Sequence, residues 1–413
     1  MAQVLPFKAI RPETDKVKQV ISESYENYSE KELAQILATN PYSFLHIITA
    51  GTTPDRPKLP IKKRFERIKH RYNEFTKQHY YQKELAPAYY VYRIQNDQGI
   101  FTGIIAKTST KDYDRNRIKK HEEIINRRKR NFANYLRHVG FNADPVLLTY
   151  PDNATIDTLI KATVSTAATY DFVINNQEHH QLWMLNNQKI VAALENAFST
   201  IPELYIADGH HRCASSSELA YIMQSREANS PKNESYNYFM SFLLSESQLK
   251  IQEFNRLLVD LNGHSVAQLL DQIAQNYHIE RFASQDQLIL SSDTQFSMYL
   301  DNAFYRLTLK QESYTFTDAL SHLAPQLLNT TILQPILGIT DVRKDPRIQY
   351  HYAKDPLSEI KKLVDSTTYS IGFGMQAVSV SALKEIADAG LKMPPKSTYV
   401  IPKLPSGLLL YEF

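Results

Sequence analysis

The chain contains a single cysteine, Cys213, and only 11 glycines among its 413 residues, well below the usual glycine frequency of about 7%. One cysteine rules out a disulfide framework and a cysteine-based zinc cage, and it indicates a reducing compartment. No glycine pair has the spacing G-x-x-x-x-G-K-[ST] of a P-loop. The motifs H-E-x-x-H and G-x-S-x-G are also absent, which argues against classical zinc proteases and serine hydrolases.

The chain also lacks a strong charge of either sign and a long apolar run. Lys and Arg number 47 against 44 Asp and Glu, a formal net charge of +3, so we expect no nucleic acid partner. The longest apolar stretches, near 239–244 and 407–411, fall short of the ~20 residues of a spanning helix. Residues 1–21 lack the apolar block of a secretory signal. We therefore expect a cytoplasmic protein that does not bind a membrane.

The order of predicted elements indicates an α+β or mixed α/β fold. Ser29 and Glu32 have the spacing of a capping box at a helix start, and the apolar residues of 61–75 follow a helical period. Alternating residues in 89–94 and 100–107 predict a hairpin, and 43–49 reads as a buried strand. Helices and strands alternate irregularly with several hairpins, which argues against a barrel or a solenoid.

Two further segments have competing interpretations. Residues 115–139 contain nine Lys or Arg and keep a helical apolar stripe, typical of a polyanion-binding helix or of a solvated face. The balanced charge of the whole chain favours the solvated face. The sequence Gly372-Phe-Gly-Met-Gln-Ala377 loosely matches a dinucleotide fingerprint, but it lies too close to the end of the chain to open a βαβ unit. We interpret it as close backbone packing at a strand.

The most informative segment is an apolar strand from residue 204 that ends in Asp208, Gly209, His210, His211 and Arg212. Glycine permits a tight turn, and a helix is predicted to follow over 212–227. A helix N-terminus favours an anion, and an arginine can donate two hydrogen bonds to a phosphate or carboxylate. We interpret this segment as an anion-binding turn. The alternative, in which the aspartate caps the helix and the histidines are surface groups, explains fewer of the five residues.

Three other features bear on a site. His121 and Glu122 bring an imidazole and a carboxylate together at what reads as a helix start. The Pro-rich tail 393–407 presents Lys396 and Ser397, either at a site or as a structural strap. Cys213 is interpreted as a small buried residue and not as a nucleophile.

These segments together resemble the family known as domain of unknown function 1015. The resemblance rests on an opening "PF.A.RP" at 6–12, a "PPYDV"-like loop at 23–27, "NP.SFLH" at 40–46, "I..HE" at 118–122, "ADGHHR" at 207–212 and "MPPKST...PKL.SGL" at 393–408. The chain departs from the family pattern at two points. Its loop has Glu-Ser-Tyr-Glu instead of Pro-Pro-Tyr-Asp, and Asn255-Arg256 stands where His-Arg is common.

The strand–D-G-H-x-R–helix element is also similar to the phosphate-binding turn of the ParB/sulfiredoxin-like fold. This resemblance implies a core of that fold with additional hairpins and helices. The polar, Pro-containing stretch 225–236 indicates a break in the chain, so we expect a mixed α/β core over 1–228 that carries the turn and an α+β domain over 229–413 that carries the tail. A sulfiredoxin would need a cysteine where the chain has His210, and a partition protein would need a helix-turn-helix domain. The remaining activity of that fold is phosphoryl transfer to or from a small alcohol such as free serine, by a kinase or a phosphatase.

On this hypothesis the site residues have three kinds of role. The expected catalytic residues are Asp208, His210, His211, Glu26 and His121. The expected phosphate-binding residues are Gly209, Arg212, Lys396 and Ser397, and the expected substrate-binding residues are Tyr25, Glu122 and Arg256. Asp208 is also the candidate ligand for Mg²⁺, and ATP, ADP or another phosphate compound is the expected donor. A non-catalytic protein that binds a nucleotide or a phosphorylated metabolite remains the alternative, and a homodimer remains open.

Overall fold

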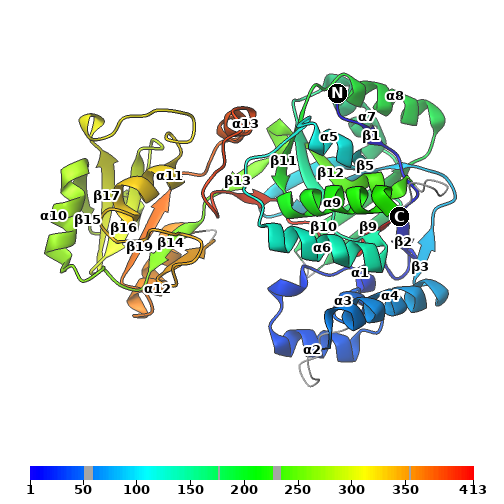
Figure 1. Ribbon diagram of the computed structural model, residues 1–413, viewed down its shortest axis with the longest axis horizontal. Helices are drawn as coiled ribbons and strands as arrows, with labels where there is room; N and C mark the ends of the chain where they lie inside the picture. The colour runs from blue at the N-terminus through cyan, green and yellow to red at the C-terminus, as the bar shows by residue number, and fades with distance from the viewer. Residues whose placement is uncertain (51–58, 175–176, 227–233, 353–354) are drawn as a thin grey trace. The chain divides into compact units, whose positions relative to one another are not determined.

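The computed structural model describes residues 1–50, 59–174, 177–226, 234–352 and 355–413 (Figure 1). Its contacts divide the chain into a first unit of residues 1–120, 124–249 and 402–413, and a second unit of residues 121–123 and 250–401. This division differs from the segments expected from the sequence, which meet after residue 228. The difference arises because strand β12, Tyr238–Ser245, pairs with β5 and β8 inside the sheet of the first unit.

The first unit is built on a nine-stranded mixed sheet of order β6-β11-β8-β12-β5-β4-β10-β9, with β1 paired to β5. Besides β12, its strands are β1 Val4–Leu5, β4 Tyr89–Asn96, β5 Gly99–Ser109, β6 Ile118–Lys119, β8 Val146–Tyr150, β9 Tyr170–Ile174, β10 Glu178–Leu185 and β11 Leu204–Asp208. The pairs β6–β11 and β8–β12 are parallel, and the other pairs in the sheet are antiparallel. This mixed arrangement confirms the predicted fold class.

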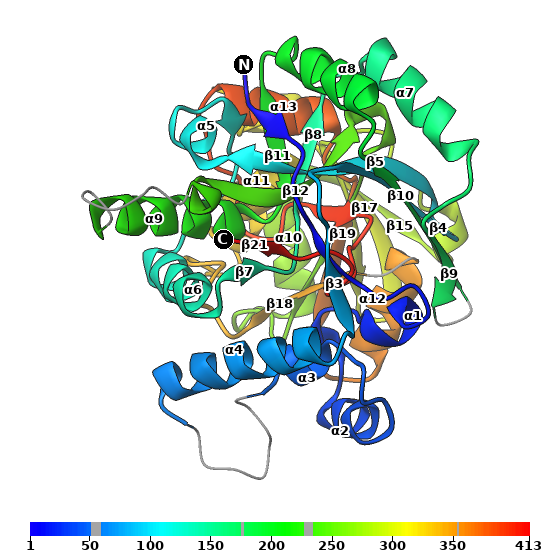
Figure 2. The same cartoon turned by 90° about the vertical axis from the view of Figure 1, so that its right-hand side faces the viewer.

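Helices cover this sheet and extend beside it. They are α1 Val17–Val20, α2 Glu30–Thr39, α3 Leu45–Ile48, α4 Ile61–Lys77, α5 Thr110–Asp114, α6 Asn126–Val139, α7 Ala154–Val164, α8 Gln188–Ser199 and α9 His210–Arg226, with short 3-10 turns η1 Tyr25–Asn27, η2 Ser235–Asn237 and η3 Glu246–Gln248. In both views α6 lies beside α9 and α7 lies beside α8 (Figures 1 and 2). Two small ladders complete the unit: β2 Ile10–Pro12 with β3 Tyr81–Lys83, and β7 Phe141–Asn142 with β21 Tyr411–Glu412.

Several local predictions are confirmed. Ser29 and Glu32 form the capping box of α2, and α4 buries the helical stripe Phe65, Ile68, Tyr72 and Phe75. The hairpin of β4 and β5 is present. The strand predicted over 43–49 is wrong, because α3 is a short helix. Local side-chain bonds favour this turn: the Leu45 amide donates to Ser43 Oγ at 3.3 Å, and Thr49 Oγ1 donates to the Leu45 carbonyl at 2.6 Å.

The basic segment 115–139 is helical only in its second half. Residues 118–119 form β6, and α6 does not begin until Asn126, so His121 and Glu122 lie in an irregular segment and not at a helix start. The apolar residue Ile118 is fully buried in the sheet core. A buried residue next to a polar one fits an edge strand as well as a helix, which is why the helical period was misleading here.

The main core of the first unit lies between the sheet and the helices α7, α8 and the start of α9. Side chains such as Ile104, Leu148 and Leu243 from the sheet meet Ile156 and Leu194 from the helices, and all are buried. The core therefore anchors the end of β11 and the first turn of α9, between which the predicted anion-binding turn lies. Among the described residues, no helix has both the length and the apolar character needed to cross a membrane.

The second unit has a six-stranded antiparallel sheet of order β15-β17-β16-β19-β14-β18. Its strands are β14 Asn255–Leu258, β15 Tyr277–Phe282, β16 Gln295–Leu300, β17 Ala303–Leu309, β18 Ile348–His351 and β19 Ile371–Met375. Its helices are α10 Val266–Asn276, α11 Ala324–Leu328, the π-helix η6 Asn329–Leu333, α12 Pro356–Asp365 and α13 Val380–Asp388, with short turns η4 Gln285–Gln287 and η5 Gln311–Ser313. A separate ladder pairs β13 Lys250–Gln252 with β20 Tyr399–Ile401. One sheet face packs on α10, α11 and η6, and the other on α12.

The glycines of the loose dinucleotide motif lie inside β19, as the packing interpretation predicted. A Cβ on Gly372 would lie 2.4 Å from Ile360 Cγ2 of α12 and 2.9 Å from Leu257 Cδ2. The missing side chain therefore allows α12 to approach the sheet closely.

We predict that Gly372→Ala lowers the free energy of unfolding by about 1–3 kcal/mol, because the added methyl overpacks this contact. Urea unfolding would measure the change. The matched control is Gly372→Ala combined with Ile360→Ala, which removes the clashing methyl. The two losses should be less than additive, and full additivity would contradict the packing explanation.

Candidate functional site

The predicted strand–turn–helix element is present in the first unit. Strand β11 ends at Asp208, Gly209 has a φ of 102°, and α9 begins at His210. The helix starts two residues earlier than predicted, so both histidines and Arg212 lie in its first turn. The Cys213 amide donates to the Gly209 carbonyl at 3.0 Å, which closes the first helical hydrogen bond. The N-terminus of a 17-residue helix thus stands directly after the sheet.

An ion pair closes this turn. Arg212 Nη2 donates to Asp208 Oδ2 at 2.7 Å, and Arg212 Nη1 donates to the carbonyl of Pro145 at 2.5 Å. The side chain of Asp208 keeps 43% exposure and that of Arg212 keeps 27%, so the pair is reachable from solvent. A register shift in β11 between Ile206 and Asp208 places Asp208 opposite Leu147 of β8. The guanidinium therefore ties the start of α9 to the ends of two neighbouring strands.

Gly209 is required at this turn for two independent reasons. Its positive φ is strained for an L-residue with a side chain. A Cβ at this position would also lie 3.0 Å from Arg212 Nε and 3.2 Å from Cζ and Nη2. The guanidinium thus packs against the glycine backbone, and any side chain would displace it.

Lys403 is a second cation at this carboxylate, and reasoning from the sequence did not assign it to the site. Its Nζ lies 3.8 Å from Asp208 Oδ1. The C-terminal segment that carries it is anchored by Ser406 Oγ, which donates to Asp144 Oδ1 at 2.5 Å, and by Gly407, whose carbonyl accepts from Tyr81 at 2.8 Å. The sequence signal that could have identified Lys403 is the "PKL.SGL" part of the tail motif. This motif lies far from Asp208 in the sequence, so nothing in the sequence connected the two residues.

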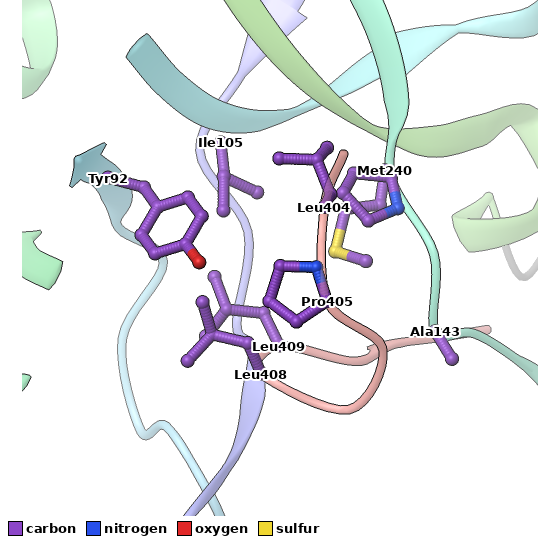
Figure 3. A pocket seen from close by; sticks show the side chains of 9 residues that line it. Tyr92, Ile105, Ala143, Met240, Leu404, Pro405, Leu408 and Leu409 are labelled. Atoms are coloured by element: carbon purple, nitrogen blue, oxygen red, sulfur yellow. The ribbon is translucent and has the colours of Figure 1, made fainter. Parts of the chain in front are cut away.

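The same segment covers a small cavity on the sheet (Figure 3). Leu404, Pro405 and Leu408 from the C-terminal segment face Tyr92 and Met240 from the sheet. The cavity encloses about 10 Å³, close to the smallest space that holds one water. Its lining is almost wholly apolar, so it is a packing defect and offers no room for a metabolite.

The two histidines that follow the glycine differ in burial. His210 is buried, with 2% exposure, and His211 is half-buried. Their catalytic roles stay predictions. Cys213 is fully buried in the core, which confirms its interpretation as a small core residue, and burial raises the pKa of its thiol. A thiol of this kind is a poor nucleophile.

The predicted residues near the N-terminus lie in the 3-10 turn η1. Tyr25 is exposed, at 52%. The side chain of Glu26 lies outside the part of the structure that is described. The roles of both residues at a site stay predictions.

The remaining predicted residues belong to the second unit, whereas Asp208–Arg212 belong to the first. Their convergence with that turn stays a prediction. Within the second unit the structure brings two of the predicted segments together. His121 is fully buried, and its carbonyl accepts from the Met393 amide at 2.8 Å. The "I..HE" segment and the start of the "MPPKST" segment are therefore neighbours, although about 270 residues separate them in sequence.

Arg256, Lys396 and Ser397 also lie together in the second unit. Arg256 is buried, with 2% exposure, and its Nη2 donates to the Lys396 carbonyl at 3.0 Å. Lys396 is exposed, and Ser397 is buried with its hydroxyl donating to the Pro394 carbonyl at 2.8 Å. The arginine therefore contacts the loop backbone and not solvent.

Comparison with known proteins gives one family and several similar folds. A family model described as "Protein of unknown function (DUF1015)" matches residues 4–332, and no curated protein sequence matches the chain. Similar solved structures include a free serine kinase in complex with AMP, at 10% identity and a TM-score of 0.35, covering 73% of this chain and 88% of that one.

Two further structures are similar to the same extent. A conserved hypothetical protein from Pyrococcus furiosus is 13% identical with a TM-score of 0.35, covering 73% of this chain and 93% of its own. SbnI with a C-terminal truncation, from Staphylococcus aureus, is 11% identical with a TM-score of 0.36, covering 72% and 82%. Similarities at this level assign no activity to the chain.

We predict that Gly209→Ala destabilises the protein by more than the backbone conformation alone explains, because the added methyl also displaces Arg212. Gly263→Ala is the matched control, since Gly263 has a φ of 79° and no atom within 4 Å of a built Cβ. The control should cost about 1–2 kcal/mol, and Gly209→Ala should cost more in chemical denaturation. Equal losses would contradict a contact between glycine and guanidinium.

We also predict that iodoacetamide does not alkylate Cys213 in the folded protein at about pH 8, close to the ordinary thiol pKa of about 8.5. Burial disfavours the thiolate, so the raised pKa keeps the thiol protonated at this pH. Mass spectrometry should detect full labelling only after unfolding in guanidinium chloride. Rapid labelling of the folded chain would show that Cys213 is accessible as thiolate.

Proposed function

The chain belongs to the DUF1015 family, and from that premise we propose that the protein transfers a phosphoryl group to or from free serine or a similar small alcohol. One observation carries the proposal. Asp208 lies between Arg212 and Lys403 at the point where a strand passes through a glycine turn into the N-terminus of α9.

The positive charge at this turn supports binding of an anion. Arg212 and Lys403 both lie beside it, and a helix N-terminus adds a partial positive charge and N–H groups without intrahelical partners. Phosphoryl transfer depends mainly on positioning and on stabilising the charge of the transferred group. A phosphate that approaches Asp208 would compete with it for Arg212. Binding of the phosphate would therefore be linked to release of the Asp208 carboxylate from Arg212.

We assign to Asp208 the role of accepting the proton of the substrate hydroxyl. A carboxylate within hydrogen-bond reach of a hydroxyl can act as general base in one direction and as general acid in the other. The two adjacent cations make Asp208 alone a weak ligand for Mg²⁺, because they oppose a divalent charge. The proposed role of Asp208 is therefore proton transfer by its carboxylate, without a metal ion on this residue.

The other residues have secondary roles in the proposal. His210 and His211 would hold the phosphate. In the hydrolysis direction, one of them could instead act as the nucleophile and carry the phosphoryl group. Glu26 is the alternative proton acceptor, and Tyr25 would contact the substrate beside it. His121 and Glu122 would orient donor or substrate, and Lys396 with Ser397 would bind a phosphate.

The experiment is incubation of the full chain with serine, O-phosphoserine, ATP, ADP and pyrophosphate in the presence of Mg²⁺, with phosphate movement followed by ³¹P NMR. Transfer to serine, or release of phosphate from O-phosphoserine, supports the proposal. Absence of both reactions across the panel contradicts it for serine. Binding of a phosphorylated compound without turnover would instead favour a regulatory protein that only binds such ligands.

We predict that Asp208→Asn lowers the rate of transfer about 10²–10⁴-fold, the usual contribution of a general acid or base, while the variant still binds the phosphorylated ligand. Arg212→Ala should weaken both turnover and binding. Asp171→Asn is the matched control, because Asp171 is a carboxylate of the same unit that pairs with His179 on an exposed strand. An Asp208→Asn variant as active as this control would contradict the assigned role.

A further inference from the structure

Lys396 has a backbone conformation that is unusual for its residue type. Its φ is 55°, at the second of two turn residues, Pro395 and Lys396, where glycine or asparagine is normally favoured. Most of the other non-glycine residues with positive φ in the described chain are Asn, Asp or His, which tolerate this region. A strained residue of this kind persists only where the surrounding structure holds it.

The structure shows what holds this turn. Arg256 donates from Nη2 to the Lys396 carbonyl at 3.0 Å and from Nη1 to the carbonyl of Phe254. Ser397, buried directly after the lysine, bonds back to Pro394. The ammonium group of Lys396 lies 5.1 Å from the centre of the Phe254 ring, and the lysine as a whole is exposed. The backbone of the turn is thus held by buried groups, while the side chain of Lys396 stays exposed.

Arg256 itself is an unusual buried group. Its interactions in the described residues are the two carbonyls and the ring of Tyr350, whose centre lies 5.2 Å away, and none of them is with a carboxylate. Burial lowers the pKa of its guanidinium to about 10, so the group is still charged at neutral pH. Burying a cation without a counter-ion is unfavourable, and the two carbonyls and the Tyr350 ring only partly offset this cost.

We propose that Arg256 is a positioning residue for Lys396. By holding the Lys396 carbonyl it fixes the positive-φ turn that presents the exposed Lys396 side chain, and its own uncompensated charge strengthens the attraction of that turn for a phosphate. Arg256 does not touch the ligand, in contrast to the substrate-binding role expected from the sequence. This inference rests on the proposed function, in which Lys396 binds a phosphate.

The test compares Arg256→Lys, Lys396→Met and the double variant in the full chain. Arg256→Lys keeps the charge but cannot reach both carbonyls, since an ammonium is a point charge and not a fork. Two readouts are used: the rate of trypsin cleavage after Lys396, which reports the turn without any activity, and the affinity for inorganic pyrophosphate by calorimetry. The midpoint of thermal unfolding checks that each variant is folded.

We expect Arg256→Lys to raise the cleavage rate after Lys396 at least about tenfold without a comparable change in global unfolding. Arg256→Lys should also weaken pyrophosphate binding about as much as Lys396→Met does. The double variant should bind pyrophosphate no more weakly than Lys396→Met, because the effects of coupled residues are not additive. Lys396→Gly is a further control. It should keep or raise stability, since glycine relieves the strained turn, and still lose pyrophosphate binding.

Two results would overturn the proposal for different reasons. Unchanged protection from trypsin in Arg256→Lys would show that Arg256 does not hold the turn, whatever Lys396 binds. Faster cleavage in Arg256→Lys together with parental pyrophosphate binding in Lys396→Met, or no binding by the parent protein, would show that Lys396 binds no phosphate. That outcome would contradict the role of Lys396 in the proposed function and leave Arg256 as a structural residue only.

Discussion

The contact between Arg212, Asp208 and the Pro145 carbonyl is the constraint on which the candidate site depends. It joins the end of β11, the start of β8 and the first turn of α9 with one guanidinium. A planar group with several fixed donors can do this, whereas a lysine cannot. The contact also favours Gly209, because a Cβ there would lie only 3.0–3.2 Å from the guanidinium. Asp208, Gly209 and Arg212 of one short motif therefore meet in a single contact.

The same contact explains how the turn could respond to a phosphate. Arg212 is satisfied by a carboxylate of the chain itself, and Lys403 lies on the other side of that carboxylate. A phosphate offers more negative charge and more acceptor oxygens than Asp208, so it could displace the carboxylate and free it to accept a proton. A competition of this kind needs an accessible pair, and the partial exposure of both side chains provides it.

The sequence was informative wherever a contact is local. The capping box of α2, the buried stripe of α4 and the turn at Gly209 each involve residues within a few positions of one another, and their chemistry can be read from spacing. Prediction was wrong for 43–49 and for the first half of 115–139. In both segments, short apolar patterns were compatible with more than one element, and bonds or pairings outside the pattern decided between them.

The sequence by itself determined that an acidic residue, a glycine and an arginine span the junction of a strand and a helix, since these are properties of neighbouring residues. Only the tertiary structure decided that Lys403 joins Asp208, that β12 lies inside the first sheet, and that Arg256 donates to the Lys396 backbone. These contacts join residues that lie between 95 and 195 positions apart in the sequence. Their free energy comes from packing of the whole unit, and no local pattern encodes that packing.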